Sequence, residues 1–165
     1  MYARILVPVD ASAAAAAGLK EALRVAQLCD ARLQLLHVVD DLDFAPEAAL
    51  HPTLPAAMMS TALEAGSALL GRLRDDALRQ GGVVESVLVE SVGRKLHEIV
   101  GEQARAWNAE LLVLGTHGRR GVERLVAGSV AEQVVRHADI PVLLVRSTEP
   151  ESQDGKLPSF AAAIG

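Results

Sequence analysis

The sequence predicts a single-domain α/β protein, in which an open parallel sheet of five strands carries helices on both faces. Five short aliphatic runs alternate with longer stretches of helical periodicity, which is typical of repeated strand–helix–strand units. The length of 165 residues fits one domain with enough chain to bury a substantial core. Hydrophobic residues make up 50% of the chain but aromatic residues only 2%. The core must therefore consist of Ala, Val and Leu, which suits helices packed closely on a sheet.

The first strand and the first helix follow from local pattern. Ile5–Val9 is nearly all apolar, as expected for a strand that is buried on both faces. A helix is expected over residues 13–29, with Ser12 as its N-cap. The apolar face of this helix carries Leu19, Ala22, Leu23 and Ala26.

The next segments continue the alternation of strands and helices. Leu33–Val39 is expected to be the second strand, followed by an acidic, proline-containing stretch that is expected to form a long loop. A helix over residues 56–80 ends at Gly81 and Gly82, because paired glycines are a strong stop signal. The remaining elements are a third strand over Val83–Val89, a helix over 94–107, a fourth strand over Leu111–Leu114, a fourth helix over 129–137 and a fifth strand over Pro141–Val145.

The stretch "GTHGRRGVERLVAGS", which follows the fourth strand, has the parts of a phosphate-binding loop. Gly115 and Gly118 lack a Cβ, so the backbone can approach a ligand closely there. Gly128 and Ser129 open the next helix, whose free N–H groups and positive dipole end attract an anion. If the strand order is 3-2-1-4-5, this loop and Asp10 after the first strand flank one crevice at the carboxyl ends of the strands.

Other site signatures are absent from the sequence. No Gly-Lys is followed by Ser or Thr, and no glycine triplet follows the first strand, so neither common nucleotide fingerprint is present. The five histidines and the single cysteine are scattered, which predicts no metal site. No Gly-x-Ser-x-Gly elbow occurs. No base with an orienting partner is visible, so no catalytic residue is assigned and any hydrolysis of a phosphate-containing ligand is expected to be slow.

Charge and composition exclude several classes of partner. A net charge of −5 and a pI near 5.5 argue against non-specific binding of nucleic acid or of an anionic membrane. No apolar run approaches the roughly 20 residues that span a bilayer. The lone Cys29 fits a reducing compartment and is expected to be buried and inert. The chain enters a strand directly after Met1–Ala3, which leaves no room for a signal peptide, so a cytoplasmic protein is expected.

The chain resembles the universal stress protein family over roughly residues 2–146. The resemblance lies in the Gly-two-Gly-nine-Gly-Ser spacing after the fourth strand and in the segments "ILVPVDAS", "LLHVVD" and "GSVAEQVVRHADIPVLLVR". It implies a flavodoxin-like (Rossmann-like) domain over residues 1–146 with strand order 3-2-1-4-5, ATP as ligand with Mg²⁺ held through the phosphates, and a homodimer. Residues 147–165 have no counterpart in the resemblance and are expected to form a flexible tail.

The resemblance also implies site residues, taken position by position. It places Pro8, Val9 and Asp10 beside the adenosine moiety and the main chain of Val38 at the adenine. It lines the phosphate loop with Gly115, Thr116, His117, Gly118, Arg119, Arg120 and Gly121 and closes the loop over the phosphates with Gly128, Ser129, Val130 and Ala131. Ala11 stands where the family often has glycine.

Several of these residues have a structural alternative. Arg119 and Arg120, together with Arg124, would also suit a solvated basic face. Gly115 and Gly118 would also suit a tight strand-to-helix connection that binds nothing. Asp10 would also suit a carboxylate that caps the helix or braces the loop. His117 fits a loop residue better than a general base, and His37, inside the second strand, fits a satisfied core or interface histidine better than a ligand.

The favoured function is a cytoplasmic nucleotide-dependent switch or sensor in a stress response. The alternatives are a slow ATPase, a nucleotide-free protein-interaction module and, least favoured because aromatic residues are scarce, a flavin domain. The homodimer is expected to form through the fifth strand, because an apolar strand at a sheet edge needs a cover. The residues of this strand that would form the interface are Val142, Leu143, Leu144 and Val145. The alternative is that the carboxyl-terminal tail covers the edge of the strand.

Overall fold

The computed structural model of the chain describes residues 1–40, 54–116 and 130–147. Within these ranges, five strands form one sheet in the order β3-β2-β1-β4-β5. Every neighbouring pair of strands is parallel. The fold class and the strand order predicted from the sequence are therefore confirmed.

The bounds of the elements agree with the sequence prediction to within two residues at each end. The strands are β1 (Arg4–Pro8), β2 (Arg32–Val39), β3 (Val83–Glu90), β4 (Leu111–Thr116) and β5 (Val142–Arg146). The helices are α1 (Ala13–Cys29), α3 (Leu54–Arg79), α4 (Leu96–Ala106) and α5 (Val130–His137). Most of the expected loop after β2 and almost all of the expected tail lie outside the described residues.

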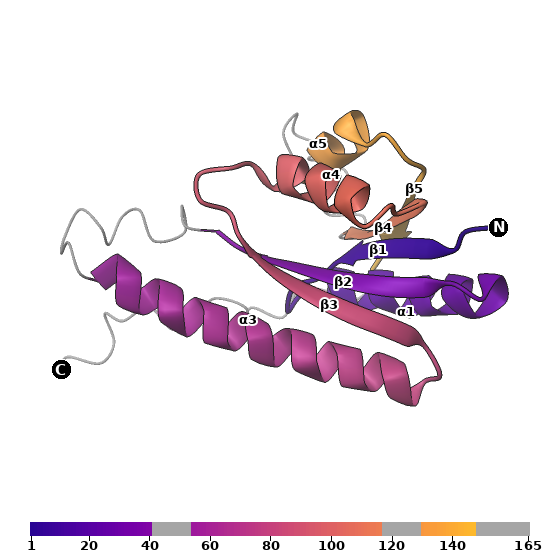
Figure 1. The fold of residues 1–165 in the computed structure, drawn as a ribbon, viewed down its shortest axis with the longest axis horizontal. Coiled ribbons are helices and arrows are strands. Elements are labelled where there is room, and N and C mark those ends of the chain that lie inside the picture. Colours follow the sequence, from indigo (N-terminus) through magenta and orange to yellow (C-terminus); the bar gives the residue numbers. More distant parts are fainter. Residues whose placement is uncertain (41–53, 117–129, 148–165) are drawn as a thin grey trace.

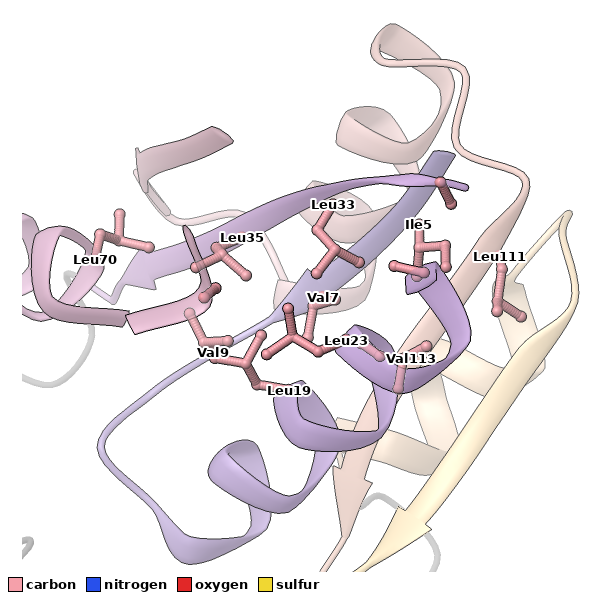
Figure 2. Packing of buried hydrophobic residues seen from close by; sticks show 14 residues of the cluster. Ile5, Val7, Val9, Leu19, Leu23, Leu33, Leu35, Leu70, Leu111 and Val113 are labelled. Atoms are coloured by element: carbon pink, nitrogen blue, oxygen red, sulfur yellow. The ribbon is translucent and has the colours of Figure 1, made fainter. Parts of the chain in front are cut away.

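Helices cover both faces of the sheet. Figure 1 shows α1 and α3 along one face and α4 and α5 along the other. Each side has its own apolar cluster, one between the sheet and α1 and α3 and one between the sheet and α4 and α5. In Figure 2, Leu19 and Leu23 of α1 point toward Val7 and Val9 at the centre of the first cluster. β1 contributes side chains to both clusters. Because both of its faces are buried, its sequence is a continuous apolar run.

Local signals set both ends of α1. The side chain of Ser12 accepts a hydrogen bond from the Ala15 N–H at 3.1 Å, as an N-cap does. At the other end, Asp30 takes the left-handed conformation with φ 54° and its N–H bonds to the Ala26 carbonyl. The expected cap and helix are confirmed. Cys29, expected to be buried, is only partly buried at the edge of the first cluster.

Small residues on α1 allow a very close approach to β4. A Cβ added to Gly18 would lie 2.8 Å from the backbone nitrogen of Gly115. A Cβ added to Gly115 would lie 1.8 Å from the carbonyl oxygen of Ala14. The two backbones therefore touch with no side chain between them, which places the carboxyl end of β4 directly beside the start of α1.

Candidate functional site

The candidate site lies where the strand order reverses. β1 pairs with β2 on one side and with β4 on the other, so the connections that leave β1 and β4 start next to each other. Six of the residues that were expected to contact a ligand at this edge are described by the structure. They are Pro8, Val9, Asp10, Val38, Gly115 and Thr116. All six stand at or near the carboxyl ends of the three central strands, as expected for a ligand site in an open parallel sheet.

The phosphate side of the candidate site is only partly described. Val130 and Ala131 open α5, the helix whose amino end was expected to face the phosphates. The other expected phosphate residues fall outside the described ranges, namely His117, Gly118, Arg119, Arg120, Gly121, Gly128 and Ser129. Their assignment therefore stays a prediction.

The end of β1 is held in place by β2. The N–H of Val9 donates to the carbonyl of Leu36 at 2.8 Å, which continues the ladder one residue beyond the strand. The carbonyl of Val9 accepts a hydrogen bond from Nδ1 of His37 at 2.7 Å. Since both polar groups of this buried backbone are paired, the direction of the chain into the next residue is fixed. His37 is thus the hydrogen-bonded histidine that the sequence suggested.

Asp10 is exposed at the mouth of the candidate site and braces its own loop. Its Oδ1 accepts a hydrogen bond from the N–H of Ser12 at 2.8 Å, two residues further on. This is the bracing role that the sequence left open as an alternative. Because the carboxylate is exposed, the brace still leaves it beside solvent at the carboxyl edge of the sheet.

Gly115 is required for a reason that differs from the one inferred from the sequence. The carbonyl of Ala14 occupies the space that a side chain would take, so the packing of α1 on β4 demands a glycine whether or not a ligand binds. Gly115 also does not adopt a positive φ. The next residue, Thr116, accepts the N–H of Ser147 at its carbonyl at 2.8 Å, which ties the ends of β4 and β5 together.

Sequence reasoning missed a polar cluster beyond the ends of β2 and β3. The Ser91 hydroxyl, in a residue that is 1% exposed, donates to Oδ1 of Asp40 at 3.0 Å, and the Ser91 N–H donates to the Val39 carbonyl at 2.9 Å. Arg94 then ties the turn together through the carbonyls of Glu90 and Ser91 and a 2.8 Å ion pair with Glu102. Gly93 marks a turn in the sequence, but no local signal pairs Ser91 with a residue 51 positions away.

A hollow of about 510 Å³ lies away from this edge, between α4 and α5. It reaches Arg4 and Glu110 at the amino ends of β1 and β4. The rings of His97 and His137 stack in its wall with centroids 4.5 Å apart. The hollow is therefore separate from the strand ends where the order reverses. In the described parts of the chain, no three His, Cys, Asp or Glu side chains gather as a metal site would need, and no helix is long and apolar enough to cross a membrane.

Comparison with known proteins indicates one family. The model of the universal stress protein family matches residues 1–146. The universal stress protein MJ0531 of Methanocaldococcus jannaschii is 33% identical over 156 residues, which cover 92% of this chain and 86% of the relative. The solved structure of hypothetical protein MJ0577 is similar with a TM-score of 0.72 and 25% identity, over 91% of this chain and 99% of that one.

Two more distant solved structures contain a bound nucleotide. A universal stress protein in complex with cAMP has a TM-score of 0.63 and 22% identity, over 89% of this chain and 99% of that one. The universal stress protein from Archaeoglobus fulgidus in complex with dAMP has a TM-score of 0.58 and 20% identity, over 87% and 98% of the two chains. At such low identity these two matches show a shared fold and do not show what this chain binds.

Proposed function

This chain belongs to the universal stress protein family, and from that premise we propose that it binds ATP and acts as a cytoplasmic nucleotide-dependent switch or sensor in a stress response. The ligand lies at the carboxyl edge of the sheet between β1 and β4. The bound cAMP and dAMP of two structural neighbours support an adenine nucleotide as the ligand class. The single cysteine is consistent with a reducing, cytoplasmic setting.

The observation that carries the proposal is the adjacency of β1 and β4 in the order β3-β2-β1-β4-β5. Parallel strands on the two sides of this point send their connections to opposite faces, which opens a crevice beyond the strand ends. The connection after β4 contains the glycine-spaced stretch, and the connection after β1 begins with the exposed Asp10. In this proposal the ligand has the Asp10 carboxylate on its β1 side and the glycine-spaced stretch, of which only Gly115 and Thr116 are described, on its β4 side.

The two sides of the proposed site bind different parts of the nucleotide. Val9, Asp10 and the main chain of Val38 form the adenosine side, where a backbone held by β2 gives a fixed surface. The glycine-rich stretch and the amino end of α5, starting at Val130, form the phosphate side, since a helix amino terminus attracts anions. Mg²⁺, where present, is held through the phosphates and supplies charge neutralisation there. Asp10 braces its loop, and among the described residues no partner orients it as a base, so we expect any hydrolysis to be slow.

The nucleotide test begins with the purified protein as it is. Freshly purified chain is denatured and any released nucleotide is identified by mass spectrometry, and the stripped protein is titrated calorimetrically with ATP, ADP, AMP and cAMP. We expect an adenine nucleotide in the released fraction and micromolar-range affinity for ATP. Gly128→Val should abolish binding, because a branched side chain would take the space of a phosphate. Absence of any nucleotide signal in both measurements would refute the proposal.

The same family membership leads us to propose a homodimer through β5. β5 is an edge strand, so one side of its backbone has no strand partner within the described sheet. Leu144 is 48% exposed on it, and the strand interior carries no charge or proline. A two-fold axis would pair the strand with its own copy and cover both edges at once.

A further inference from the structure

The ring of His37 connects three elements at the adenosine side of the candidate site. It belongs to β2, it bonds the carbonyl of Val9 just beyond β1, and it lies against α3 at Gly66. A carbonyl can only accept a hydrogen bond, so Nδ1 of His37 carries the proton and donates it. The side chain is therefore committed to holding the Val9 carbonyl at 2.7 Å.

Gly66 makes room for that ring. A Cβ at this position would lie 2.7 Å from Cδ2 and 3.2 Å from Nε2 of His37. It would also lie 3.0 Å from a methyl group of Leu88 on β3. A glycine inside a helix is unfavourable, and this one lies in the middle of the 26-residue α3. Its presence is explained by the imidazole beside it, since a larger residue would force the ring to move.

A second glycine on the same helix shows that the contact is specific to one position. Nothing lies within 4 Å of the point that a Cβ on Gly71 would occupy. α3 therefore offers a matched pair of glycines, one against the histidine and one facing open space.

We propose that His37 is a positioning residue of the nucleotide crevice, and that α3 controls nucleotide affinity through the contact between Gly66 and His37. The proposal rests on the proposed ATP function and adds a regulatory route to it. His37 holds the Val9 carbonyl, Val9 leads directly into Asp10, and α3 determines where the His37 ring sits. By linkage, a nucleotide that favours this arrangement also stabilises the packing of α3 over the ring.

Four variants of the full chain test the route by ATP titration calorimetry. His37→Leu removes the donor and should weaken ATP binding about tenfold, as loss of a hydrogen bond to a buried carbonyl would. His37→Asn keeps an N–H donor close to the backbone, and its ATP affinity should stay within about threefold of that of wild type. Gly66→Ala should weaken binding by about three- to tenfold through displacement of the ring, whereas Gly71→Ala should leave it unchanged.

A second measurement separates positioning from general loosening of the fold. Hydrogen exchange of α3 around Gly66 should slow when ATP is added to wild type and to His37→Asn, and should not respond to ATP in His37→Leu. If His37→Leu does not fold, Gly66→Ala still tests the route, because that variant retains the His37 N–H donor. Equal affinity of Gly66→Ala and Gly71→Ala, or of His37→Leu and His37→Asn, would overturn the route. If wild type itself binds no ATP, the proposed function and the route both fail. If wild type binds ATP and the variants bind it with the same affinity, only the route fails.

Discussion

At the scale of single residues, the contact between Gly18 and Gly115 sets how closely α1 lies on β4. Neither glycine has a positive φ, so backbone freedom does not explain them. Both are explained by space, because the neighbouring backbone occupies the place of each missing side chain. The glycine that begins the glycine-spaced stretch is therefore part of the packing of the fold as well as a candidate ligand contact.

Replacing Gly115 by alanine should strongly destabilise the protein. The new Cβ would meet the Ala14 carbonyl oxygen at 1.8 Å, and a helix backbone cannot move aside without shifting the whole of α1. We expect the free energy of unfolding to fall by about 3 kcal/mol or more, at the upper end for an overpacked core. Denaturant unfolding measures this loss. Gly71→Ala, into open space, should instead stabilise by up to about 1 kcal/mol, and an equal midpoint for the two variants would disprove the packing explanation.

Asp10 allows the bracing role to be separated from the binding role. Asp10→Asn keeps a carbonyl oxygen that can accept the Ser12 N–H, whereas Asp10→Ala removes the acceptor. We expect Asp10→Ala to weaken ATP binding less than Gly128→Val does, because it touches only the adenosine end. Calorimetric titration of both Asp10 variants measures the difference. Unchanged affinity in Asp10→Ala would make this carboxylate purely structural.

Sequence reasoning succeeded at residues whose role is local and failed where a partner is distant. The Ser12 cap was predictable because its hydrogen bond spans three residues. The brace by Asp10 could be stated only as an alternative, although it too is local. The demand on Gly115 comes from Ala14, about a hundred positions away, and the partner of Ser91 is Asp40. No pattern within one segment reveals such pairs, because the fold alone brings them together.

At the scale of elements, the turn from β3 (Val83–Glu90) to α4 is held in a strained shape. Val92 has φ 47°, a region that β-branched residues avoid, and the residue is 69% exposed. Arg94 and the buried Ser91 bond the turn on both sides of it. The surrounding hydrogen bonds thus impose the left-handed conformation on a residue that does not favour it.

Replacing Val92 by asparagine should relieve that strain and stabilise the protein. Asparagine tolerates the left-handed region, and little apolar burial is lost at a side chain this exposed. We expect the free energy of unfolding to rise by about 0.5–1 kcal/mol. Val83→Asn serves as the control, because Val83 is 57% exposed in a strand with ordinary φ and should lose stability. A rise in both variants, or in neither, would contradict the strain argument.

Ser91 should be the most sensitive polar residue of this turn. Its hydroxyl is buried and donates a hydrogen bond to the Asp40 carboxylate, so Ser91→Ala removes a hydrogen bond to a charged acceptor. We expect a loss of about 1.5–3 kcal/mol in unfolding free energy, the range for hydrogen bonds to charged groups. Thermal or denaturant unfolding measures it, with Ser86→Ala on β3 as a partly buried serine control. A smaller loss in Ser91→Ala than in the control would show that the cluster does not stabilise the turn.

At the scale of the whole molecule, the sheet has two edges of different character. β3 forms one edge and carries Glu85 and Glu90, charges that discourage further strand pairing. β5 forms the other edge and is apolar between Pro141 and Arg146. This asymmetry supports the proposed association through β5, in which a two-fold axis would give a closed pair of molecules and no open chain of them.

Leu144 is the residue at which the proposed dimer can be tested without disturbing the core. Its neighbour Leu143 packs against the apolar cluster beneath α1, whereas Leu144 is 48% exposed. Leu144→Lys should convert the protein from a mass of about twice 17.4 kDa to 17.4 kDa in light scattering, because a two-fold contact would bring the new charges of both copies together. Val83→Lys on the β3 edge should leave the dimer intact. A third form, truncated after Ser147, distinguishes the alternative cover. A monomeric wild type whose truncated form aggregates would assign the β5 edge to the tail, and a dimer that survives Leu144→Lys would place the interface elsewhere.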